Sequence, residues 1–188
     1  MLDPDRVSLL YTGRFGSYGR DPAAFAEAIG RIGAASPELA SRLEVAIAGP
    51  LTPEERALFE GAADGPVKVS LLGSIERETS LALQRRADAL LLLAQPRRSQ
   101  LVNFKLFEYL AAGRPILALA AGTEAGRIAA DAGVAPVVRA DDPEAIESAL
   151  QRLAERGLEG PDPEASARYS YPAAAESMAG VLDAASGR

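Results

Sequence analysis

Cationic and glycine residues that could bind a phosphate are concentrated in two short segments of the chain. Residues 12–20 contain three glycines together with Arg14 and Arg20. Residues 94–103 contain two further arginines and lead to Lys105. Glycines allow a ligand to approach the backbone closely, and the free N–H groups of a helix N-terminus favour negative charge. Because the whole chain carries a net charge of −6, this gathering of cations indicates a site for a phosphate or a diphosphate.

Each of these features also has a simpler interpretation. The glycine spacing in residues 12–20 does not match the dinucleotide-binding pattern G-x-G-x-x-G, so the segment could be a tight turn between a strand and a helix. Arg97 and Arg98 could be a solvated pair. Lys105 and Glu108 are three residues apart and could form a surface ion pair on a helix. The prediction of an anionic ligand therefore depends on whether the fold brings the two segments together.

Short apolar runs alternate along the chain with amphipathic stretches. Runs without polar alternation predict strands that are buried on both faces, as in parallel sheets. The predicted strands are residues 7–11, 43–48, 67–72, 89–93, 115–119 and 135–138. Helical periodicity with capping signals predicts helices between them. The predicted helices are residues 23–32, a helix that begins after Thr52, and residues 76–87, 103–112, 123–132, 143–156 and 172–185.

Turn and capping residues mark several of these boundaries. Asp21, which precedes a proline, is the expected N-cap of the first helix, and Gly33 is expected to end that helix. Ser36 precedes another proline and could begin a further helical turn. Residues 52–55, Thr-Pro-Glu-Glu, predict a capping box. Residues 157–163 have the composition of a linker.

Six strands in alternation with helices predict a doubly wound α/β fold with right-handed crossovers. We expect a six-stranded parallel sheet of the Rossmann-like type, with the strand order 3-2-1-4-5-6, followed by a C-terminal helix. In that order strands 1 and 4 are neighbours, and ligands bind at the carboxyl ends of the strands where the winding reverses. Residues 12–20 and 94–103 would flank this switch point. The prediction is one domain over residues 1–188, in which residues 158–188 form a linker and the last helix.

Composition excludes several classes of protein. The chain has no cysteine and no histidine, which excludes zinc ribbons, iron–sulfur clusters, thiol catalysis and a histidine general base from within it. The negative net charge disfavours nonspecific binding to nucleic acid, and no apolar run approaches the ~20 residues that span a bilayer. The N-terminus does not resemble a signal peptide, and the Ala/Arg-rich, Lys-poor composition is typical of a GC-rich bacterial genome. We therefore expect a bacterial protein of the cytoplasm.

Residues 103–117, NFKLFEYLAAGRPIL, resemble a signature of GT-B fold glycosyltransferases, particularly those of the family 4 type. Other segments match the same family in chain order: residues 11–14 with Arg20, and residues 45–49, 72–75, 87–92 and 169–171. The resemblance covers nearly the whole chain but only the C-terminal half of such an enzyme, which binds the nucleotide-sugar donor. It implies that the N-terminal, acceptor-binding domain is missing from this chain and that the last helix would return to it.

The resemblance also implies roles for individual residues. Arg14 and Arg20 would hold the donor diphosphate and stabilise it as it leaves, while Gly13 and Gly16 would let the backbone approach it. The family has an E-x7-E motif whose second carboxylate falls at Glu108. This carboxylate is expected to accept hydrogen bonds from the two ribose hydroxyls.

Three positions depart from the family pattern. Gln100 stands at the first glutamate of the motif, and Asn103 stands where a glycine is usual. Lys105 replaces a small or β-branched residue and would add a phosphate contact.

The resemblance implies base contacts from the backbone near Ser74 and Ile75, so the identity of the base cannot be predicted from side chains. Tyr109, Leu110 and Phe107 are interpreted as core or pocket wall.

The resulting hypothesis is the donor-binding half of a retaining glycosyltransferase that uses a UDP-, GDP- or ADP-sugar and no metal or other cofactor. The chain alone should not turn over efficiently, because the two domains must close to complete the site. The full enzyme could be peripheral at the inner membrane. Two alternatives remain: the donor half of a nucleotide-sugar epimerase, and a non-catalytic nucleotide-binding or assembly module. Gln100 gives the second alternative some support.

Overall fold

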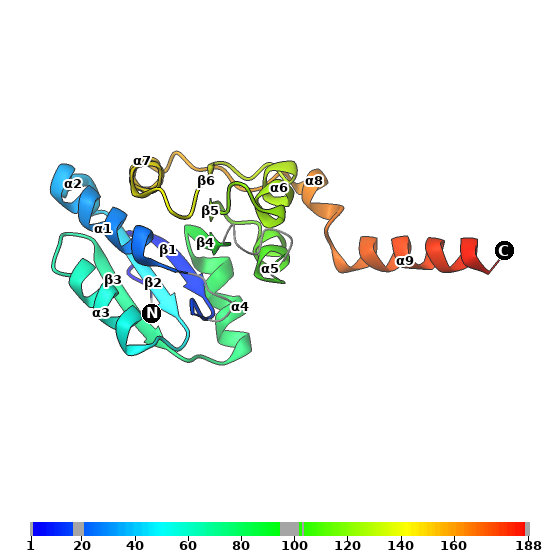
Figure 1. Cartoon of the computed structure of the whole chain (residues 1–188), viewed down its shortest axis with the longest axis horizontal. Coiled ribbons are helices and arrows are strands. Elements are labelled where there is room, and N and C mark those ends of the chain that lie inside the picture. Colours follow the sequence, from blue (N-terminus) through cyan, green and yellow to red (C-terminus); the bar gives the residue numbers. More distant parts are fainter. Residues whose placement is uncertain (1, 17–20, 95–101, 103, 187–188) are drawn as a thin grey trace.

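The structure is a computed structural model that describes residues 2–16, 21–94, 102 and 104–186 (Figure 1). Its sheet has six strands in the order β3-β2-β1-β4-β5-β6, and each neighbouring pair is parallel. The predicted fold class and strand order are therefore confirmed. The strands are β1 Val7–Thr12, β2 Leu43–Ala48, β3 Lys68–Gly73, β4 Ala89–Leu93, β5 Ile116–Leu119 and β6 Val137–Val138.

Helices cover both faces of the sheet. They are α1 Ala23–Ala35, α2 Pro37–Ala40, α3 Pro53–Ala62, α4 Arg77–Arg86, α5 Phe104–Ala112, α6 Glu124–Asp131, α7 Pro143–Ala154, α8 Pro163–Ala167 and α9 Tyr171–Ala185. One hydrophobic core lies between the sheet and α1, α3 and α7, and a second lies between the sheet and α5 and α6. Leu9 belongs to the first core and its neighbour Leu10 to the second. Successive strand residues point to opposite faces, so burial on both sides explains why the strand sequences lack polar alternation.

Most predicted helix boundaries agree with the structure, and a few need correction. The capping box is present, because Thr52 accepts from the N–H of Glu55 and the Glu55 carboxylate accepts from the N–H of Thr52. The first helix begins at Ala23 as predicted, but its N-cap position is Pro22 and not Asp21, and the helix continues past the expected stop at Gly33 to Ala35. The Asp21 carboxylate still accepts from the N–H of Ala23 at 2.9 Å.

The segment after α7 is more ordered than the predicted linker. Its last residue, Pro163, begins the short helix α8, and the preceding Asp162 caps it by accepting from the N–H groups of Glu164 and Ala165. The chain then enters α9, which extends away from the rest of the molecule (Figure 1). None of the α9 side chains is buried. In the part of the chain that the structure describes, no helix has both the length and the hydropathy needed to cross a membrane.

Candidate functional site

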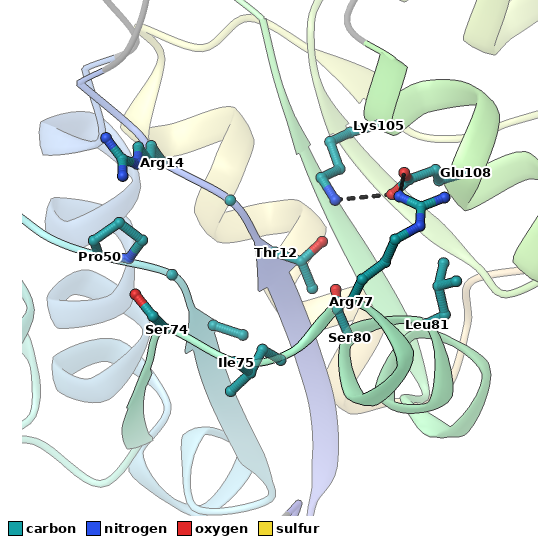
Figure 2. A pocket seen from close by; sticks show the side chains of 13 residues that line it. Thr12, Arg14, Pro50, Ser74, Ile75, Arg77, Ser80, Leu81, Lys105 and Glu108 are labelled. Atoms are coloured by element: carbon teal, nitrogen blue, oxygen red, sulfur yellow. Dashed lines mark hydrogen bonds and ion pairs between the residues drawn. The ribbon is translucent and has the colours of Figure 1, made fainter.

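A cavity of about 350 Å³ lies at the carboxyl ends of the strands, on the β1 side of the predicted switch point (Figure 2). Five segments that are distant in sequence form its wall, as expected for a doubly wound sheet. The lining residues are Thr12, Gly13 and Arg14 after β1, Ala48, Gly49 and Pro50 after β2, Ser74 and Ile75 after β3, Arg77, Ser80 and Leu81 on α4, and Lys105 and Glu108 on α5.

The Glu108 carboxylate is held between two cations at this cavity. Lys105 donates from Nζ to Glu108 Oε2 at 2.8 Å, and Arg77 donates from Nη1 to Glu108 Oε1 at 3.2 Å. The first of these is the ion pair that the i,i+3 spacing on α5 allows. The Glu108 side chain is 20% exposed, whereas that of Arg77 is 75% exposed. Figure 2 shows the carboxylate between the two cationic groups, with Arg77 approaching from α4.

The pKa of Glu108 reflects opposing effects. Burial raises the pKa of this carboxyl, but the hydrogen bond and charge of Lys105, together with hydrogen bonds from Arg77 and Gln84, outweigh burial and lower the pKa below its ordinary value. Glu108 is therefore ionised at neutral pH. A carboxylate has about four acceptor positions on its two oxygens, and the two cations leave room for further O–H donors.

The turn after β1 is fixed by close backbone packing. Gly13 donates its N–H to the carbonyl of Ala48 at 2.8 Å, and Tyr11 donates its hydroxyl to the carbonyl of Arg14 at 2.9 Å. Gly49 has a φ of 155° and is so close to the Gly13 carbonyl that a Cβ atom at this position would overlap it. The Arg14 side chain is exposed, and Figure 2 shows it on the opposite side of the cavity from Lys105. Arg14 and Lys105 thus line the cavity from opposite sides.

Six of the residues predicted from the sequence line this cavity: Gly13, Arg14, Ser74, Ile75, Lys105 and Glu108. Gly16 does not line it. A Cβ at Gly16 would be 3.0 Å from Glu55 Oε1, which places this glycine against the start of α3. Arg20, Gln100 and Asn103 lie outside the described residues, as do Arg97 and Arg98.

Sequence reasoning missed Arg77, although it forms part of the cavity wall. Arg77 is the first residue of α4, which follows the loop that contains Ser74 and Ile75. Its position just after a strand end was the only signal in the sequence, and α4 contains two other arginines, Arg85 and Arg86. Among the residues that the structure describes, no group of three acidic side chains is placed to hold a metal ion.

The cavity therefore combines three kinds of surface. Ile75 and Leu81 provide apolar contact, Glu108 provides hydrogen-bond acceptors, and Arg14 and Lys105 provide positive charge beside a glycine turn. A ligand with a ring, a pair of hydroxyl groups and a phosphate chain could use all three surfaces at once.

Comparison with known proteins agrees with this chemistry. Residues 6–156 match the sequence model of a family described as "Glycosyl transferases group 1". The comparison with curated proteins gives no match.

Several solved structures share the fold. The trehalose-6-phosphate synthase OtsA superposes with a TM-score of 0.58 and 18% identity, over 88% of this chain and 39% of that one. WaaG, a glycosyltransferase involved in lipopolysaccharide biosynthesis, superposes with a TM-score of 0.58 and 20% identity, over 89% of this chain and 42% of WaaG. MnaA of S. aureus, in a co-structure with UDP, superposes with a TM-score of 0.58 and 13% identity, over 87% of this chain and 43% of MnaA. The chain thus spans about two fifths of the length of these proteins.

Proposed function

Because the chain belongs to the group 1 glycosyltransferases, we propose that it binds a nucleoside-diphosphate sugar as the donor half of a retaining glycosyltransferase. The observation that carries this proposal is the Glu108 carboxylate, which lies between Lys105 and Arg77 in the switch-point cavity. A charged acceptor in that place suits a vicinal diol, and the adjoining cations suit a diphosphate. The UDP in the MnaA co-structure supports a nucleoside diphosphate as a ligand of this fold.

In this proposal the diphosphate lies over the turn at Gly13, between Arg14 and Lys105, and Arg20 supplies a further cation. Preorganised positive charge stabilises the diphosphate as the bond to the sugar breaks, without a bound metal or other cofactor. In a retaining front-face reaction, the departing phosphate oxygen remains close to the acceptor hydroxyl that attacks. Gln100 and Asn103 would contact the sugar side of the donor, and Gly16 would keep the first loop close to the ligand.

The nucleoside would occupy the other half of the cavity. Glu108 would accept hydrogen bonds from the ribose hydroxyls, using acceptor positions that Lys105 and Arg77 leave open. The base would lie against Ile75 and Leu81, with backbone contacts from the segment at Ser74. The proposed donor is a UDP-, GDP- or ADP-sugar.

The acceptor would be bound by a second domain outside this chain. Tyr171, Met178, Val181 and Leu182 of α9 expose large apolar side chains, from 58% to 81% of their area. We propose that residues 1–188 act as one donor-binding domain and that α9 packs against an acceptor-binding domain in a cytoplasmic bacterial enzyme, which could associate with the inner membrane.

Calorimetric titration of the 188-residue chain with UDP, GDP, ADP and their sugars tests this function directly. We expect one of the diphosphates to bind with a dissociation constant in the micromolar-to-millimolar range, or about −4 to −8 kcal/mol, because the second wall of a closed site is missing. We expect no sugar transfer by this chain alone. Absence of binding to all three diphosphates and their sugars would rule out the donor-site proposal, and efficient transfer by the chain alone would rule out the need for a second domain.

Replacing Arg14 with alanine is expected to weaken diphosphate binding selectively. The guanidinium is exposed, so the lost charge-assisted contact should be worth only about 1–1.5 kcal/mol. Titration with a nucleoside diphosphate and with the corresponding nucleoside separates a phosphate contact from a general effect on the loop, because the nucleoside should lose almost no affinity. Arg56→Ala, which removes an exposed arginine of α3, is the control for net charge. Equal losses for nucleoside and diphosphate would mean that Arg14 shapes the loop and does not contact phosphate.

A further inference from the structure

The edge of β1 that faces β4 lacks strand partners at both of its ends. β1 pairs with β2 along its full length, from Val7 to Thr12, but it pairs with β4 only at Leu9 and Leu10. Successive N–H groups of a strand point to opposite neighbours. Val7 and Gly13 donate toward the β2 side, to the carbonyls of Arg42 and Ala48. The N–H groups of Ser8 and Thr12 therefore point to the side where β4 does not pair with them.

Side chains from elsewhere in the chain accept these two N–H groups. At the amino end, Ser8 donates its N–H to Asp88 Oδ2 at 2.9 Å. At the carboxyl end, Thr12 donates its N–H to the hydroxyl oxygen of Tyr109 at 3.0 Å. Tyr109 belongs to α5 and follows Glu108 directly. Because β4 does not pair with Thr12, the Tyr109 hydroxyl takes the place of a strand carbonyl as the acceptor of the Thr12 N–H.

The Tyr109 hydroxyl is fully enclosed. Tyr109 is 0% exposed, and its hydroxyl shares a second hydrogen bond of 3.1 Å with Thr12 Oγ1. Gln84, also buried, donates from Nε2 to the same Thr12 oxygen at 3.2 Å. Burial raises the pKa of the Tyr109 hydroxyl, so the group stays protonated at physiological pH. A protonated hydroxyl oxygen can still accept a hydrogen bond, here from the Thr12 N–H. Because water does not reach this place, removal of the hydroxyl would leave a buried N–H without an acceptor.

We propose that Tyr109 is a positioning residue, whose hydroxyl fixes the turn at Gly13 and Arg14 for binding the donor diphosphate. Thr12 precedes this turn directly, and Figure 2 shows it at the end of β1, between α4 and the Lys105 side chain of α5. The turn is thus held by Tyr109 before Gly13 and by Tyr11 after it, where the Tyr11 hydroxyl donates to the carbonyl of Arg14. The inference rests on the proposed function in one respect, namely that the ligand of this turn is a diphosphate.

The variant Tyr109→Phe removes one oxygen and keeps the ring that fills the core. Asp88→Ala is its matched control, because it removes the side-chain acceptor of the Ser8 N–H, at the other end of the same β1 edge. Both variants should unfold at lower urea concentration than the unaltered chain. Amide hydrogen exchange in the free protein then reports the local effect. We expect the Thr12 amide to exchange about tenfold faster relative to that of Leu9 in Tyr109→Phe only, and unaltered relative exchange of Thr12 would overturn the proposal.

Ligand titration provides the second measurement. UDP, GDP and ADP are each titrated alongside the corresponding nucleoside. In Tyr109→Phe the affinity for the bound diphosphate should fall about tenfold, with less than a twofold change for its nucleoside, while Asp88→Ala changes neither. Equal losses for both ligands, or the same diphosphate loss in Asp88→Ala, would assign Tyr109 a general role in stability and overturn the proposal. If the unaltered chain binds none of the diphosphates, the proposed function fails, and the exchange measurement still decides whether Tyr109 fixes the turn.

Discussion

Replacing Gly49 with alanine is expected to lower the free energy of unfolding by about 3 kcal/mol, because the new methyl group would enter space held by backbone. Gly49 has a φ of 155°, where side chains other than hydrogen are strained. A Cβ atom there would overlap the carbonyl of Gly13, and no side-chain rotation can relieve an overlap with backbone. Gly49 also donates its N–H to the carbonyl of Gly73 at 2.7 Å. Gly49, which follows β2, therefore contacts the turn after β1 and the last residue of β3.

Urea denaturation and ligand titration together measure the effect. Gly30→Ala is the matched control, because Gly30 lies inside α1 with open space where a Cβ would be. That change should stabilise the chain by about 0.5–1 kcal/mol through helix propensity. Gly49→Ala should also weaken diphosphate binding at urea concentrations where the variant remains folded, since it pushes Gly13 out of place. A Gly49→Ala variant with unchanged stability and affinity would show that this close approach does not fix the cavity.

The sheet could be predicted well because its strands carry a strong local signal. The expected bounds of 43–48 and 89–93 are those of β2 and β4, since a continuous apolar run between turn residues specifies a strand buried on both faces. The sixth strand was expected over four residues but pairs only at Val137 and Val138. It lies at the sheet edge and follows Pro136, which has no N–H to donate.

The missed helix α8 shows the limit of periodicity. Its five residues, Pro163–Ala167, complete little more than one turn and bury only Ala165. A segment this short cannot display an apolar stripe, so only its cap was readable. Asp162 followed by proline is the same signal that marked the start of α7 at Asp142. A long amphipathic stretch follows the cap at Asp142, whereas none follows the cap at Asp162.

Lys105 and Glu108 could be predicted as part of the candidate site because both lie in one short sequence segment. Lys105 and Glu108 share the first turns of α5, and their ion pair follows from their spacing. The interpretation of Tyr109 as core or pocket wall agrees with its burial. Its hydroxyl, however, bonds to a residue 97 positions away, and the contact of Arg77 with Glu108 spans 31 positions. Such contacts depend on how α4 and α5 are placed across the sheet, which no local pattern specifies.

Replacing Glu108 with alanine is expected to abolish discrimination between ribose and 2′-deoxyribose ligands. If the carboxylate accepts hydrogen bonds from both ribose hydroxyls, the unaltered chain should bind a 2′-deoxynucleoside diphosphate more weakly by about 1–3 kcal/mol, the cost of a lost hydrogen bond to a charged acceptor. In Glu108→Ala the ribose and deoxyribose ligands should bind with nearly equal affinity. The fold should persist, because this side chain lines a cavity and is not part of either hydrophobic core.

The effect on a ligand without ribose separates the two roles that the geometry allows for Glu108. As the partner of Lys105 and Arg77, the carboxylate neutralises positive charge, so its removal should leave pyrophosphate affinity unchanged or raise it. As the ribose acceptor, it should favour only ligands that carry the diol. Glu78→Ala, which removes an exposed carboxylate of α4, controls for the change in net charge. Isothermal titration measures the three affinities that are needed, those for a ribonucleoside diphosphate, for its 2′-deoxy counterpart and for pyrophosphate.

The pH dependence adds an independent check on the same carboxylate. The pKa of Glu108 lies below its ordinary value, so the ribose preference should persist as the pH is lowered to the ordinary glutamate pKa and should disappear only when the pH falls through the lower value of the folded chain. Glu108→Gln keeps the size and one acceptor oxygen, and its weaker ribose preference should not vary with pH in this range. If Glu108→Ala retains the full preference for ribose, the carboxylate serves only its ion pairs with Lys105 and Arg77, and the ribose must be recognised by another part of the cavity.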